Sequence, residues 1–94
     1  MTQEYLVGEL SLRLGQLQAT APRTASGDVA RLRYQVETRP AALLGTEVTQ
    51  ALALADKLCW ESLTDGDAAA FSRQAAICAD LRLFGASARL IDDG

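Results

Sequence analysis

A chain of 94 residues is long enough for a single domain, but its core is of marginal size if it stands alone. Hydrophobic residues make up 49% of the chain and charged residues 22%, which excludes a disordered chain. The net charge of −3 argues against nucleic-acid binding, because such binding depends on neutralising phosphates. No apolar run suggests a signal peptide or a membrane span, so a cytoplasmic location is expected.

The first helix is predicted from Gln3 to about Ala19. Thr2 is its expected cap, since a threonine oxygen accepts a hydrogen bond from an amide of the first helical turn. Gly8 and Gly15 each either permit close helix packing or are tolerated at the surface. Apolar residues recur at gaps of three, four and three, which places them on one side of the helix: Val7, Leu10, Leu14 and Leu17.

A loop is predicted over residues 20–27, because proline, glycine and hydroxyl residues are concentrated there. A short second helix is then predicted from about Asp28 to Glu37, with Ser26 or Asp28 as its cap. Arg39 precedes Pro40 and is therefore disfavoured in a helix, which ends this segment. The inward residues of the second helix are expected to be Val29, Leu32 and Val36.

The third helix is predicted from Thr46 to Leu63, after a turn at residues 40–44. An alternative start lies at Pro40, because proline suits the first helical position and the apolar spacing continues across Gly45. The residues that carry this spacing are Leu44, Val48, Ala51, Ala55 and Leu58.

The turn at residues 64–67 should fold the third helix back on a fourth, giving a main hairpin over residues 46–91. Gly66 suits the left-handed conformation that ends a helix, and Asp67 suits the cap of the next one. The fourth helix is predicted from Ala68 to about Leu90. Its apolar side is broad enough to contact two neighbouring helices, and comprises Ala70, Ile77, Leu81, Phe84, Ala88 and Ile91, with Phe71, Ala75, Cys78 and Gly85 beside them.

These elements predict an all-α protein in which residues 1–94 form one up-and-down four-helix bundle with a short second helix. The chain has few aromatic residues and many alanines, so each helix buries little apolar area and the core is small. Self-association is one remedy, so a homodimer through the leftover apolar faces of the first and fourth helices is expected.

The two cysteines, Cys59 and Cys78, are expected to stay unpaired. A hairpin that turns after Asp65 places Cys59 level with Ser72, so the two thiols are offset by about six residues, or about 9 Å at 1.5 Å per residue. We interpret both cysteines as small buried hydrophobic residues. Two thiols without a histidine are also too few ligands for a zinc site, and neither a metal nor a cofactor is predicted.

No catalytic residues are predicted. The chain has no histidine, which removes the general base of serine and cysteine nucleophile systems and the commonest metal ligand. Carboxylates gather near the turn of the main hairpin, where capping and solvation explain them: Asp56, Glu61, Asp65 and Asp67. The sequence therefore favours a protein that is not an enzyme.

Two sets of residues are candidates for binding. Trp60 is either a core or helix-edge residue or an interface anchor. Because tryptophan is enriched where interfaces bind most strongly, we take it as a binding candidate and group with it the stripe Gln74, Ile77, Leu81 and Phe84. The alternative set is Arg31, Arg33 and Arg39, whose guanidinium groups could hold an anion. On a helix, however, Arg31 and Arg33 point about 200° apart.

The expected function is a non-catalytic helical module, such as an adaptor, regulatory subunit or inhibitor, that binds another protein. One alternative is a small helical enzyme or effector-binding subunit that holds an anionic ligand with the arginines of the second helix. The other is a nucleic-acid-binding regulator, which would need a basic face that this chain lacks.

Overall fold

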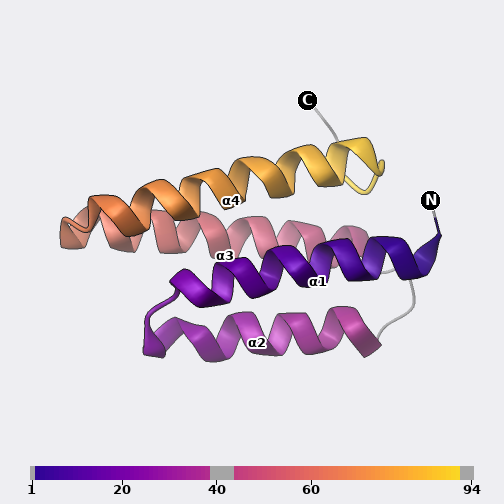
Figure 1. Cartoon of the computed structure of the whole chain (residues 1–94), viewed down its shortest axis with the longest axis horizontal. Coiled ribbons are helices and arrows are strands. Elements are labelled where there is room, and N and C mark those ends of the chain that lie inside the picture. The colour runs from indigo at the N-terminus through magenta and orange to yellow at the C-terminus, as the bar shows by residue number, and fades with distance from the viewer. Residues whose placement is uncertain (1, 39–43, 92–94) are drawn as a thin grey trace.

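The computed structural model describes residues 2–38 and 44–91, which form four α-helices and no strand. The helices are α1 (Gln3–Thr20), α2 (Arg23–Thr38), α3 (Leu44–Asp65) and α4 (Ala68–Ser87). Each helix runs opposite to the one before it, as the labels and colours in Figure 1 show. The predicted all-α, up-and-down bundle is confirmed.

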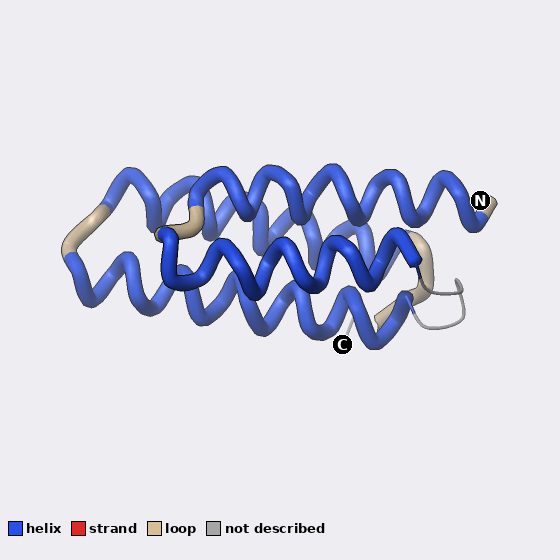
Figure 2. Tube along the Cα trace, turned by 90° about the horizontal axis from the view of Figure 1, so that it is seen from below, coloured by secondary structure: helices blue, strands red, loops and turns tan. Residues whose placement is uncertain are grey.

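The bundle is built from two antiparallel pairs, α1 with α2 and α3 with α4. The pairs join where α1 contacts α4 and where α2 contacts α3, and the view from below shows all of these helices lying along one common direction (Figure 2). Within the described residues α2 and α4 do not meet. As a result, α4 is covered by α1 and α3 alone, and one of its sides is left open.

The core contains the apolar residues that the helical spacing predicted. All three predicted residues of α2 and all five of α3 are buried, and only Val7 of the α1 set is half-buried. Ala25 joins them from the start of α2. The buried residues of the main cluster are Leu10, Leu14, Leu17, Ala25, Val29, Leu32, Val36, Leu44, Val48, Ala51, Ala55, Leu58, Leu81 and Phe84.

The predicted caps of α1 and α4 are also confirmed. The amide of Tyr5 donates to Thr2 Oγ1 at 3.2 Å, and the amide of Ala70 donates to Asp67 Oδ1 at 3.0 Å. Gly66 ends α3 with φ of 76°, in the left-handed region that glycine adopts without strain. Local chemistry thus specifies the turn between α3 and α4.

The predicted loop over residues 20–27 is confirmed only at Ala21 and Pro22, because α1 continues through Thr20 and α2 begins at Arg23. The carbonyl of Pro22 accepts hydrogen bonds from the amides of Ala25 and Ser26, at 3.0 and 2.9 Å, and so starts the helix. Ser26 and Asp28 consequently lie within α2 and do not cap it. At 16 residues α2 is the shortest of the described helices, but it is longer than predicted.

The bounds of α3 and α4 also differ from prediction. α3 begins at Leu44 rather than Thr46 and continues to Asp65, whereas the alternative start at Pro40 and most of the predicted turn at 40–44 lie outside the described residues. α4 ends at Ser87, before the predicted end at Leu90.

The early end of α4 is a tight turn in which Arg89 has φ of 59°. The amide of Leu90 returns to the carbonyl of Gly85 at 2.8 Å, and that of Arg89 to the carbonyl of Ala86 at 3.1 Å. This is the hydrogen-bond pattern of a Schellman motif, with arginine where glycine is usual. The turn brings Leu90 and Ile91 back over the beginning of α3.

Candidate functional site

A groove lies along the outer side of the α3–α4 hairpin, and we call it the outer groove. Its volume is about 390 Å³. Trp60 is 64% exposed and Leu63 is 55% exposed, although both are large apolar residues. The lining residues are Asp56, Cys59, Trp60 and Leu63 of α3 with Phe71, Ala75, Cys78, Ala79 and Arg82 of α4.

The outer groove exists because α4 is apolar around most of its circumference. Leu81 and Phe84 point into the core and are buried, whereas Ala76, Ala79 and Leu83 are exposed on the opposite side, Leu83 by 69%. A helix that is apolar all round is normally covered on all sides. Since only α1 and α3 pack on α4 among the described helices, its outer side is uncovered apolar surface.

The structure separates Trp60 from the other predicted partner-binding residues. Gln74 and Leu81 are completely buried, Phe84 is 9% exposed, and Ile77 is half-buried against the core. The predicted stripe is therefore the inner side of α4, which α1 and α3 cover. A partner could reach only Trp60 of this set without opening the bundle.

Gln74 is a polar link between three helices. Ser62 Oγ of α3 donates to Gln74 Oε1 at 2.7 Å, and Gln74 Nε2 donates to the carbonyl of Thr20, the last residue of α1, at 3.3 Å. The carbonyls at a helix end lack partners within the helix, so this amide satisfies one of them. Gln74 therefore finds its hydrogen-bond partners within one chain.

The register of the hairpin also corrects the predicted placement of the cysteines. Because Ser62 meets Gln74, position 59 lies nearly level with position 78, and Cys59 and Cys78 line the same groove. Gly66 and Asp67 lengthen the turn, and side chains tilt toward the N-terminus of each helix, so the levels differ from those expected of a turn directly after Asp65. Both thiols are free, as predicted, but they are half-buried rather than buried.

Burial raises the pKa of the Cys59 thiol above its ordinary value, and the nearby Cys78 and Asp56 raise it further. A thiol with a raised pKa is protonated at neutral pH, and the thiolate is the form that reacts. Cys59 is therefore unsuited to act as a nucleophile. Within the described ranges, no group of three histidine, cysteine, aspartate or glutamate side chains is placed to hold a metal ion.

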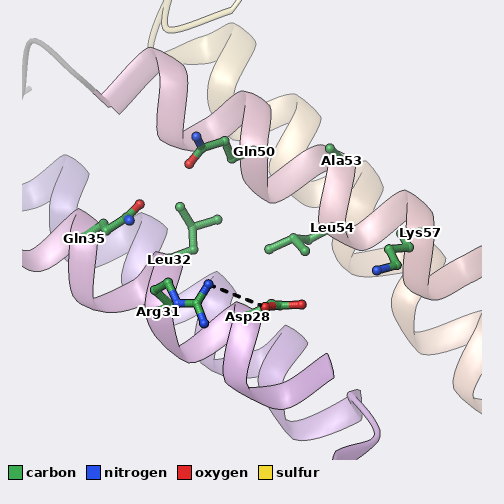
Figure 3. Close-up of a pocket in the computed structure, with 8 residues that line it drawn as sticks. All are labelled: Asp28, Arg31, Leu32, Gln35, Gln50, Ala53, Leu54 and Lys57. Carbon is green, nitrogen blue, oxygen red and sulfur yellow. Dashed lines mark ion pairs between the residues drawn. The ribbon is translucent and has the colours of Figure 1, made fainter. Parts of the chain in front are cut away.

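A second groove, of about 420 Å³, lies between α2 and α3 (Figure 3). Leu32 and Leu54 face each other across it, and Arg31 and Lys57 approach from opposite walls. Arg31 lies 3.9 Å from Asp28, at the limit of an ion pair. The remaining lining residues are Gln35, Gln50 and Ala53.

The predicted arginine set does not form one clamp in the described structure. Arg33 points to α1, where its Nε donates to Ser11 Oγ at 3.0 Å. The same Nε lies 3.6 Å from Oε1 of Glu37, which is on α2 itself. Gly15 leaves room for this guanidinium group, since a Cβ there would lie 3.2 Å from Arg33 Nη1. Arg31 faces the other way, as its 200° separation predicted, and Arg39 lies outside the described residues.

Arg13 is a structural residue that sequence reasoning missed. It pairs with Glu9 at 2.6 Å and Asp80 at 2.9 Å, and its guanidinium carbon lies 4.7 Å from the centre of the Phe84 ring. The ion pair between Glu9 and Arg13 could have been predicted from their spacing, because side chains four residues apart meet on a helix. These contacts join α1 to the inner side of α4 and leave the outer groove untouched.

Comparison of the chain with protein-family models, with curated proteins and with solved structures finds no match. None of the helices in the described ranges has both the length and the apolar character needed to cross a membrane.

Proposed function

We propose that this protein is a non-catalytic helical module that binds protein through the outer groove. The observation that carries the proposal is Trp60, which is 64% exposed beside an apolar groove. Tryptophan combines a large apolar surface with one hydrogen-bond donor, and it is enriched among the residues that contribute most to binding. An adaptor, a regulatory subunit or an inhibitor in the cytoplasm would act in this way.

The chemistry of the groove supports a binding role over catalysis. Its titratable side chains are one aspartate, two cysteines and one arginine, and the sequence has no histidine to serve as a base. The raised pKa of Cys59 keeps that thiol protonated. The floor and walls are otherwise apolar, which suits the burial of a protein surface.

The groove between α2 and α3 gives weaker support to the alternative of anion binding. Arg31 and Lys57 are present there, but Asp28 lies beside Arg31 and offsets its charge. Arg33 is engaged with Ser11 and Glu37. The exposed apolar surface of the outer groove is less usual on a protein surface than the basic residues of the groove between α2 and α3. We therefore favour protein binding over anion binding.

The proposal is tested by affinity capture from native cell extract with three tagged baits: the wild type, Trp60→Ala and Tyr34→Ala. Tyr34 is the matched control, since it is an aromatic residue 67% exposed on α2 and outside the outer groove. We expect one stoichiometric protein on the wild type and on Tyr34→Ala, and its loss on Trp60→Ala. Equal capture by all three baits, or no capture by a wild-type bait that is monomeric, would overturn the proposal.

A further inference from the structure

We propose that a second copy of this chain covers the outer groove, related to the first by a two-fold axis parallel to α3 and α4. The inference rests on the proposed function, because it names the protein that the groove binds. A half-turn about such an axis keeps every residue at its own level along the bundle. It lays α3 of each copy against α4 of the other, so that one patch meets itself, as in most homodimers.

The two sides of the outer groove are complementary in size. The α3 side presents the bulky, exposed Trp60 and Leu63, and the α4 side presents the small Ala75 and Ala79 beside the half-buried Phe71. The half-turn places the bulky side of each copy over the small side of the other. Large residues packed opposite small ones fill an interface without voids.

The charges of the groove are complementary under the same rotation. Asp56 lies on α3 and Arg82 on α4, both are exposed, and neither forms an ion pair within the described ranges. From the Ser62–Gln74 hydrogen bond, Asp56 is six residues along α3 and Arg82 eight residues along α4. The two levels differ by about 3 Å at 1.5 Å per residue, a gap that an arginine side chain spans.

The rotation therefore creates two identical Asp56–Arg82 pairs between the copies. An unrelated partner would have to match the size and the charge pattern independently, whereas a second copy supplies both. The contact also covers the outer side of α4, whose inner side α1 and α3 already cover. Self-association also buries additional apolar surface, which compensates for the small core expected of a 94-residue chain.

Sedimentation equilibrium of the purified full chain tests the inference, with helical circular dichroism of each variant as the control for folding. We expect a dimer at tens of micromolar. Trp60→Ala should weaken dimerisation by about 30-fold or more, as removal of a central anchor does, and Tyr34→Ala should leave it unchanged.

Charge exchange tests the orientation of the two copies. Asp56→Arg and Arg82→Asp should each weaken the dimer by about fivefold or more, because each places like charges together. The double variant Asp56→Arg with Arg82→Asp should restore an affinity close to that of the wild type. Failure of the double variant to recover would overturn the proposed axis.

A wild-type chain that remains monomeric at these concentrations overturns the inference. If that monomer still captures a different protein in a Trp60-dependent way, the proposed function stands without self-association. If it captures nothing, both fail. A dimer that tolerates Trp60→Ala and both charge variants also overturns the inference, because its contact lies elsewhere.

Discussion

At the scale of single residues, Gln74 shows how a polar group is accommodated in a small core. It is completely buried, yet its oxygen accepts from Ser62 and its nitrogen donates to the carbonyl of Thr20. A buried amide is tolerated only when such partners are present. Because the Ser62–Gln74 bond links α3 to α4, it helps to fix which residues face each other across the outer groove.

Replacement of Gln74 by leucine should lower the free energy of unfolding by about 1–3 kcal/mol. The side chains are similar in size, but the half-buried Ser62 hydroxyl and Thr20 carbonyl would lose their partner, and each would be left without a hydrogen bond. Urea unfolding of the variant measures the change. The control is Gln50→Leu, at an exposed position of α3, which should change stability by less than about 0.5 kcal/mol. Equal losses in both variants would contradict the role assigned to the buried amide.

At the scale of elements, one glycine of α2 and one of α4 have opposite structural roles. Gly27 lies within α2, is exposed, and has no atom within 4 Å of the place where a Cβ would stand. Gly85 lies in α4 where a Cβ would come within 2.9 Å of Val48 Cγ1 and Ile91 Cδ1. The first glycine is tolerated on a surface, and the second allows α4 and the turn that follows it to approach α3.

Alanine at these two positions should therefore act in opposite directions. Gly27→Ala should raise the free energy of unfolding by about 0.5–1 kcal/mol, since alanine favours a helix and meets no neighbour. Gly85→Ala gains the same helix propensity but should lower stability by about 1–3 kcal/mol, because the added methyl overpacks the core. Thermal unfolding of both variants measures the sign, and a shift in the same direction for both would contradict the packing assigned to Gly85.

At the scale of the whole molecule, a small core and an uncovered apolar surface occur together. The Cα atoms extend over 40 × 28 × 16 Å, so the bundle is thin in one direction. In such a shape α4 lies at an edge with one side open, and that side carries exposed Leu83 beside the outer groove. Stability and assembly are then linked, because a second copy on this side would add to the buried surface.

This linkage predicts that the melting temperature rises with chain concentration. For a dimer that unfolds to two free chains, a tenfold increase in concentration should raise Tm by about 3 to 5 °C for a domain of this size. Differential scanning calorimetry at several concentrations measures the slope. The slope should be smaller in Trp60→Ala and unchanged in Tyr34→Ala, and a wild-type Tm that is independent of concentration would contradict the linkage.

The sequence by itself determined the inward sides of α1, α2 and α3 and the turn between α3 and α4. These features depend on local chemistry, namely helical periodicity and the capping groups of Thr2, Gly66 and Asp67. Trp60 was a candidate for its residue type alone, because tryptophan is enriched at interfaces, and its exposure comes from the tertiary structure.

Only the tertiary structure decided the start of α2, the role of the α4 stripe and the level of the two cysteines. Each depends on neighbours that spacing along the chain does not reveal: the core contact of Ala25, the cover that α1 and α3 provide over Leu81 and Phe84, and the Ser62–Gln74 bond that sets the register. A helix as apolar as α4 has more than one possible inner side, and packing against α1 and α3 selects which side is left for the outer groove.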